Sequence, residues 1–140
     1  MKILAIFTCY NRKNLTKQSI ETLRENQNIT FDYVVVNDGS TDGTAEMLAA
    51  QPDTIDIING DGGLFWNRGM YEAIKHTKKN HPDYEYYMLM NDDTKFVPGI
   101  FDEMLTSLDN KKVLIGAIRG EDGKLSYGGI KYVKVARSQY

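Results

Sequence analysis

Four apolar runs, separated by stretches with helical periodicity, constrain the fold of this chain more than any other feature. They cover residues 3–7, 31–36, 54–58 and 84–90. They are rich in β-branched and aromatic side chains, which suit strands covered on both faces. Strands that alternate with helices form a parallel sheet. The chain is therefore predicted to have an α/β fold with helices on both faces of a mostly parallel sheet.

The stretches between these runs predict the helices. The first helix is expected to begin after an N-cap at Asn14, with Leu15, Ser19 and Leu23 on its buried face. Further helices are expected from residue 41 or 42 to 50, from about 66 to 80, and from Pro98 onward. Residues 113–118 are predicted to form a fifth strand. Residues 121–123 are predicted to form a hairpin-like turn, with extended segments at 125–127 and 130–135.

Length and composition fit a single domain over residues 1–140 with one core. Charged residues make up 26% and hydrophobic residues 41% of the chain, and the formal net charge is −2. The absence of a basic stripe argues against a nucleic acid partner. No apolar stretch is long enough to span a bilayer. A cytoplasmic protein is expected, and a peripheral contact with the inner face of a membrane is left open.

The chain has one cysteine and two histidines. Cys9 ends the first apolar run and is predicted to be a small buried hydrophobe, because a disulfide within the chain is excluded. His76 and His81 have no metal-ligand spacing with other His or Cys residues. They are therefore predicted to be surface residues.

Polar residues follow the predicted strands where each strand ends. They are Thr8, Tyr10, Asn11 and Arg12 after the first run, Asn37 and Asp38 after the second, Asp61 after the third, and Asn91, Asp92 and Asp93 after the fourth. Because the carboxyl ends of parallel strands share one edge, these residues are expected to meet in one cleft. The crowded oxygen ligands of residues 91–93 suit Mg²⁺ or Mn²⁺ carrying a diphosphate, although Asn and Asp are also ordinary turn residues.

The glycine-rich phosphate motifs are absent from the chain. No G-x-G-x-x-G follows the first strand, and no G-x-x-x-x-G-K-[ST] is present. Diphosphate binding is therefore expected to depend on a metal held by carboxylates. A phosphate-receiver domain would need paired acids after the first strand, where this chain has Thr8, Cys9 and Tyr10.

Several candidate side chains have a structural alternative that the sequence leaves open. Asp38 can accept the imide N–H of uracil or thymine, or it can form an Asx turn. The Tyr10 ring can lie against the base or pack over the first helix. Arg68 can contact base or phosphate, or be a solvated helical arginine. Phe65 and Trp66 can wall a sugar pocket or serve as core anchors.

Four segments, taken together, resemble the family 2 glycosyltransferases of the GT-A fold. Residues 7–12 read Phe-Thr-Cys-Tyr-Asn-Arg and are similar to the family's first nucleotide-binding segment. Residues 34–44 are similar to its Val-Asp-Asp-Gly-Ser-x-Asp-x-Thr stretch, with Asn37 in place of the first Asp. Residues 64–70, Leu-Phe-Trp-Asn-Arg-Gly-Met, resemble the third segment of rhamnosyltransferase-like members. Residues 91–93, Asn-Asp-Asp, resemble a variant of the D-x-D motif.

The resemblance implies a Rossmann-like GT-A domain with a role for each matching residue. Thr8 and Asp38 would contact the base of a nucleotide-diphosphate sugar, Asp92 would face the ribose, and Asp93 would coordinate Mg²⁺ or Mn²⁺. The implied nucleotide-sugar-binding residues are Thr8, Tyr10, Asn11, Asp38, Asn67, Arg68, Asn91 and Asp92. Many members carry Arg-Asn-x-Gly in the third segment, whereas residues 66–69 read Trp-Asn-Arg-Gly, so the arginine is displaced.

The implied reaction is a metal-dependent, inverting transfer from a UDP- or dTDP-sugar to an acceptor hydroxyl in polysaccharide or glycoconjugate synthesis. The acceptor would be a glycan or a lipid-linked sugar, and the third segment hints at a deoxysugar donor such as dTDP-rhamnose. Inverting members use a carboxylate base from a segment downstream of the D-x-D motif. No convincing base follows Asp93, because Glu121 and Asp122 lie in a turn that reads as solvated.

The missing base predicts that this chain is the N-terminal, nucleotide-binding part of a larger transferase, truncated at its C-terminal side. A homodimer through an apolar face is left open. One alternative is a nucleotide-binding module without turnover. A second, a sugar nucleotidyltransferase, is disfavoured because it needs a glycine-rich basic loop after the first strand, and residues 8–12 contain no glycine.

Overall fold

The computed structural model describes residues 1–26, 28–106, 113–120 and 122–127. The chain groups into two compact units, Met1–Phe101 and Asp102–Tyr140, and each is described by itself. The expectation of one domain over residues 1–140 stays a prediction.

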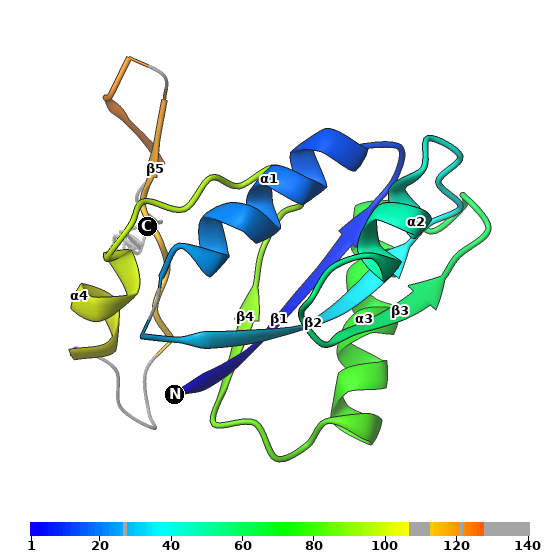
Figure 1. The fold of residues 1–140 in the computed structure, drawn as a ribbon, viewed down its shortest axis with the longest axis horizontal. Helices are drawn as coiled ribbons and strands as arrows, with labels where there is room; N and C mark the ends of the chain where they lie inside the picture. Colours follow the sequence, from blue (N-terminus) through cyan, green and yellow to red (C-terminus); the bar gives the residue numbers. More distant parts are fainter. Residues whose placement is uncertain (27, 107–112, 121, 128–140) are drawn as a thin grey trace, which may run out of the picture. The chain divides into compact units, whose positions relative to one another are not determined.

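The first unit is built around a four-stranded parallel sheet (Figure 1). Its strands are β1 (Lys2–Cys9), β2 (Thr30–Asn37), β3 (Ile55–Asn59) and β4 (Tyr86–Leu89), and they lie in the order β3-β2-β1-β4. Ile6 of β1 pairs with Val34 of β2 on one side and with Leu89 of β4 on the other. All residues of β1 and β2 after the first are buried, as expected for strands covered on both faces.

Helices cover both faces of this sheet (Figure 1). The helices α1 (Lys13–Arg24) and α2 (Thr44–Ala49) lie on one face, and α3 (Phe65–Asn80) lies on the other. None of the helices in the described part of the chain is long and apolar enough to cross a membrane. The predicted α/β class, with a GT-A-type parallel sheet between two layers of helices, is confirmed.

The apolar core under α3 holds this helix against the sheet. It consists of Leu4, Ile6, Val34, Val36, Met70 and Ala73. Burying a side chain of this size stabilises a fold by roughly 1.5–3 kcal/mol. Cys9 at the end of β1 is only 3% exposed, and burial raises the pKa of its thiol to about 12. The prediction that Cys9 is a small buried hydrophobe is confirmed.

The start of α1 differs from the expectation. The helix begins at Lys13, and Asn14 is not its N-cap. Lys13 N donates a hydrogen bond to Asp42 Oδ2 at 2.9 Å, so a distant loop satisfies a donor that a local cap would otherwise take. Leu15 is 43% exposed, so its predicted burial is wrong, and Thr16 takes the buried position. The predicted burial of Ser19 and Leu23 is confirmed.

The helix expected from Pro98 begins later. α4 (Ile100–Thr106) follows a turn in which Ile100 N donates to Val97 O at 3.2 Å. Gly99 has a φ of 78° in this turn, which is outside the right-handed helical region. The helix therefore cannot include Pro98.

The second unit contains a small antiparallel hairpin of β5 (Ile118–Arg119) and β6 (Leu125–Tyr127). Its turn is closed by Gly123 N, which donates to Gly120 O at 2.9 Å. The predicted hairpin-like turn is confirmed. The predicted fifth strand is wrong, because residues 113–117 adopt no regular structure and have no pairing partner among the described strands. The extended segment expected at 130–135 lies outside the described residues, as does Glu121.

Candidate functional site

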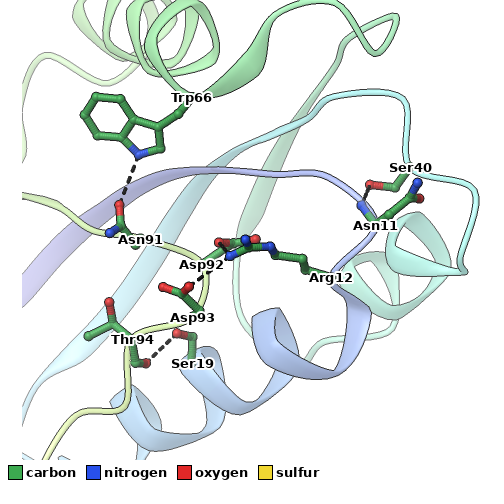
Figure 2. Close-up of polar contacts among 9 residues, drawn as sticks. All are labelled: Asn11, Arg12, Ser19, Ser40, Trp66, Asn91, Asp92, Asp93 and Thr94. Atoms are coloured by element: carbon green, nitrogen blue, oxygen red, sulfur yellow. Dashed lines mark hydrogen bonds and ion pairs between the residues drawn. The ribbon is translucent and has the colours of Figure 1, made fainter. Parts of the chain in front are cut away.

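Loops at the carboxyl ends of β1 and β4 bring Arg12 against two carboxylates (Figure 2). Arg12 Nη1 lies 2.9 Å from Asp93 Oδ2 and 3.4 Å from Asp92 Oδ1. β1 and β4 pair in parallel, so residues that follow them in the chain emerge at the same edge of the sheet. The structure thus brings Arg12 to two adjacent carboxylates that lie 80 and 81 positions further along the sequence.

The two carboxylates lie in different environments. Asp92 is only 7% exposed. Burial raises the pKa of Asp92, and the neighbouring Asp93 adds to this increase, while Arg12 opposes it. The side chains of Arg12 and Asp93 are 48% and 45% exposed. An ion pair between such exposed groups is worth about 1 kcal/mol or less, so a bound cation can replace Arg12 at Asp93.

An open pocket of about 310 Å³ lies over these side chains. Its lining residues are Arg12, Trp66, Asn91, Asp92 and Asp93. Trp66 Nε1 donates a hydrogen bond to Asn91 Oδ1 at 3.0 Å, which fixes the indole at the pocket wall (Figure 2). Trp66 is 59% exposed and Phe65 is 78% exposed. Neither aromatic residue is a core anchor, so that alternative is wrong.

The donor set of the pocket fits a hard divalent cation. Asp92 and Asp93 offer carboxylate oxygens and Asn91 offers an amide oxygen, which are the ligands that Mg²⁺ and Mn²⁺ prefer. The Arg12 guanidinium supplies the positive charge that these carboxylates attract. A bound divalent cation would supply the positive charge that Arg12 supplies to these carboxylates in the structure.

Asp38 lies at the end of β2, where its carboxylate holds the loop between β3 and α3. Its Oδ1 accepts the backbone N–H of Gly62 at 2.9 Å. Its Oδ2 accepts those of Leu64 at 2.9 Å and Phe65 at 3.0 Å. Each carboxylate oxygen has two lone pairs, so Oδ1 retains one for a further donor. The local Asx-type contact belongs instead to Asn37, whose Oδ1 accepts Ser40 N at 3.3 Å.

Thr8, near the end of β1, and Tyr10, just after the strand, lie in opposite environments. Thr8 is buried, and its hydroxyl donates to Val36 O at 3.2 Å. Tyr10 is 53% exposed. A Cβ added at Gly62 would lie 4.0 Å from Tyr10 Cε2, so the ring reaches the loop that Asp38 holds. Tyr10 therefore offers an exposed aromatic face at the same edge of the sheet.

Asn11 joins the loop after β1 to the loop after β2 (Figure 2). Its backbone N–H donates to Ser40 Oγ at 3.0 Å, and its Oδ1 accepts Thr41 N at 2.7 Å. Its φ of 49° places it in the left-handed region, which Asn tolerates better than most residues. Asn67 and Arg68 lie exposed in the first turn of α3. Their side chains make no hydrogen bond or ion pair with other residues of the described ranges.

Two features of the described residues were not predicted from the sequence. The first is Arg12 as the partner of both carboxylates, which depends on β4 lying next to β1. The second is a cluster in which His76 Nε2 and His81 Nε2 lie 2.7 Å and 2.9 Å from Asp56 Oδ2. Both histidines are partly exposed, in line with the prediction of surface residues, but their shared contact with Asp56 was not expected. The contact arises because the C-terminal end of α3 lies near the start of β3, and the spacing of two histidines across a helix end was the one available signal.

Comparisons with known proteins identify the family. The family model described as glycosyl transferase family 2 matches residues 5–132. A stretch of 92 residues, 66% of the chain, is 28% identical to the poly-beta-1,6-N-acetyl-D-glucosamine synthase of Staphylococcus aureus (strain MSSA476) and covers 22% of that protein. A stretch of 47 residues, 34% of the chain, is 40% identical to an uncharacterized glycosyltransferase of Rickettsia bellii (strain RML369-C) and covers 7% of it. The chain spans about a fifth of the length of the Staphylococcus aureus relative. The match over most of its length shows that this chain belongs to glycosyl transferase family 2.

Proposed function

We propose that this chain binds the donor of a glycosyltransferase that moves a sugar from a UDP- or dTDP-sugar to an acceptor hydroxyl of a glycan in polysaccharide synthesis. Membership of the family supports sugar transfer. The printed name of the Staphylococcus aureus relative, a synthase of a polysaccharide, supports the class of product. The observation that carries the proposal is the convergence of Arg12, Asp92 and Asp93 on one open pocket.

The diphosphate is proposed to bind where Arg12 meets the carboxylates. Asp93, the more exposed of the two, would hold Mg²⁺ or Mn²⁺, with Asp92 and Asn91 beside it. The bound metal would stabilise the negative charge of the leaving nucleoside diphosphate. Arg12, once released from Asp93, can reach a phosphate oxygen, because a guanidinium forms paired hydrogen bonds with phosphate.

The nucleoside is proposed to lie beside the loop that Asp38 holds. The remaining lone pair of Asp38 Oδ1 can accept an imide N–H, and the exposed Tyr10 ring can lie against the base. Thr8, which is buried at this edge of the sheet, would also contact the base. Asn67 and Arg68 lie in the first turn of α3, where the helix dipole favours a negatively charged ligand.

The sugar is proposed to contact Trp66. Its indole is held by Asn91 and its ring is exposed toward the pocket. Aromatic faces suit the C–H faces of a pyranose. A carboxylate would deprotonate the acceptor hydroxyl. The acceptor oxygen would then attack the anomeric carbon as the nucleoside diphosphate leaves, which inverts the configuration at that carbon. Asp122 is not assigned as this base, because it is exposed and its Oδ1 accepts Lys124 N at 3.0 Å within its own hairpin.

Calorimetry with UDP and dTDP, with and without Mn²⁺, tests the binding proposal. We expect Mn²⁺ to strengthen nucleotide binding, and Asp93→Asn to weaken the metal-dependent part by about 10-fold or more. Asp83→Asn, which changes an exposed carboxylate between α3 and β4, is the matched control and should bind like the unchanged chain. Nucleotide binding that ignores both Mn²⁺ and Asp93→Asn would contradict the proposal.

Release of free sugar from the donor tests turnover. A transferase that lacks its acceptor is expected to hydrolyse the donor slowly, whereas a nucleotide-binding module binds the nucleotide and releases no sugar. The nucleotide-binding module without turnover is supported by Asp122, whose Oδ1 accepts Lys124 N within its own hairpin. The assay should use the full 140-residue chain with Mn²⁺, with Asp93→Asn as the inactive reference.

A further inference from the structure

Three side chains of types that can bind a metal ion meet at the end of the sheet opposite the pocket. Asp56 is the second residue of β3, so it lies near the amino ends of the parallel strands. His76 lies near the C-terminal end of α3, and His81 is the residue that ends this helix. α3 covers one face of the sheet, mainly against β1 and β2, and runs back from the pocket edge, so its last turn lies near the start of β3, where His76 and His81 meet Asp56 (Figure 1). The cluster is therefore separate from the residues around Asp93.

The ligand atoms converge on one point. His76 Nε2 lies 2.7 Å and His81 Nε2 lies 2.9 Å from the same oxygen, Asp56 Oδ2. All three ligand atoms lie within 4.8 Å of one another. Zinc binds imidazole nitrogen and carboxylate oxygen at about 2.0–2.2 Å, so neighbouring ligands of a tetrahedral ion lie about 3.3 Å apart. Each contact with Asp56 therefore needs to open by only about half an ångström to admit an ion.

The scaffold around the cluster is rigid. Asp56 is paired with Val34 in the sheet, and His81 N donates to Thr77 O at 2.8 Å at the end of the helix. The ring of Tyr84 packs edge-on against that of His81, with centroids 6.1 Å apart. Sites built on helices and strands hold their ligands more precisely than sites on loops.

The cluster is also accessible. The three side chains are between 25% and 38% exposed, so an ion can enter and a water molecule can occupy the fourth position. Asn80 Nδ2 lies 3.0 Å from His76 Nε2, and this amide would have to turn aside for that nitrogen to give its lone pair to a metal.

We propose that Asp56, His76 and His81 form a zinc-binding site that joins the C-terminal end of α3 to strand β3. Two imidazoles with one carboxylate favour a borderline transition metal such as Zn²⁺ over Mg²⁺ or Ca²⁺, which prefer oxygen ligands alone. The site is independent of the metal proposed at Asp93. Its role is to stabilise the fold, because an ion that binds only the folded state shifts the folding equilibrium toward that state.

Calorimetric titration with Zn²⁺ of the untagged 140-residue chain, first stripped with a chelator, tests this site. We expect one tightly bound Zn²⁺ per chain and a rise in the unfolding temperature upon binding. His81→Gln and Asp56→Asn should each weaken zinc binding by about 100-fold or more, since loss of outer partners alone costs 10–100-fold. Asp93→Asn and Asp83→Asn are the controls and should retain zinc binding at full strength.

Nuclear magnetic resonance of the unchanged chain provides a test that does not depend on the folding of any variant. The chain contains only two histidines, so two imidazole signals report the whole set. Zn²⁺ should shift both signals together, at one equivalent. If neither imidazole signal responds, or if His81→Gln and Asp56→Asn bind zinc as well as the unchanged chain, the cluster is a metal-free polar contact and the proposal is overturned.

Discussion

Gly69 lies in α3 directly over Thr8 of β1, and no side chain fits between the two. A Cβ added at Gly69 would lie 2.5 Å from Thr8 Oγ1 and 2.9 Å from Thr8 Cβ. Real Cβ atoms essentially never approach other atoms this closely, so something would have to shift. Thr8 cannot yield easily, because it lies on a central strand and donates its hydroxyl to Val36 O. At the scale of the residue, Gly69 sets how closely the helix approaches the sheet next to the site.

Gly69→Ala is therefore expected to destabilise the chain by about 1–3 kcal/mol, the usual cost of overpacking. This loss outweighs the preference of about 1 kcal/mol for Ala over Gly in a helix. Denaturant unfolding followed by circular dichroism measures the change. Gly116→Ala is the control, since an added Cβ there meets nothing within 4 Å. A Gly69→Ala chain more stable than the unchanged one would show that the helix is free to move outward.

At the scale of the element, the link between β3 and α3 is held by a buried carboxylate from β2. Asp38 is 3% exposed and accepts three backbone N–H groups of this loop. Phe65, the first residue of α3, has a φ of 53°, which a bulky residue rarely adopts without support. The same loop carries Trp66 toward the pocket, so the position of the pocket wall depends on Asp38.

Asp38→Asn is expected to lower the free energy of unfolding by roughly 1–3 kcal/mol. The amide keeps the shape of the side chain but turns an N–H group toward backbone donors, and a buried donor without an acceptor costs about 1–3 kcal/mol. Denaturant unfolding measures the loss, and proteolysis is expected to cut the loop at residues 60–64 sooner. Asp61→Asn is the control, because Asp61 is exposed and accepts only Gly63 N. Unchanged stability together with weaker nucleotide binding would instead assign Asp38 to the ligand alone.

At the scale of the whole molecule, the stability of the first unit depends on its central strands. Leu4 of β1 is 1% exposed and belongs to the core under α3, whereas Leu15 of α1 is 43% exposed. Leu4→Ala is expected to cost about 2–5 kcal/mol, because it removes buried methyl groups and leaves a cavity. Leu15→Ala, the matched control, should change stability by about 0.5 kcal/mol or less. Thermal or denaturant unfolding of both variants measures the difference, and equal losses would contradict the contrast in burial between the two leucines.

The fold could be predicted from the chain at the level of its elements. The apolar runs and helical stretches predicted the parallel sheet between layers of helices, because the spacing of apolar residues along a segment indicates whether it forms a strand or a helix. Ends of elements were less predictable. α1 begins where Asp42 accepts Lys13 N, and α4 is delayed by the positive φ of Gly99. Such contacts and backbone angles arise from neighbours that a local pattern does not contain.

The class of fold, the polar residues at the strand ends and the resemblance to the family all follow from the order of residues along the chain. Which of those polar residues meet depends on how the strands and helices pack. The strand order places β4 beside β1, so Arg12 faces Asp92 and Asp93, and it turns Asp38 toward the backbone of the loop before α3. It also brings His76 and His81 to Asp56. The physical reason is that contacts across a sheet depend on which strands pair and which helix covers them, and these long-range choices leave no periodic signal along the chain.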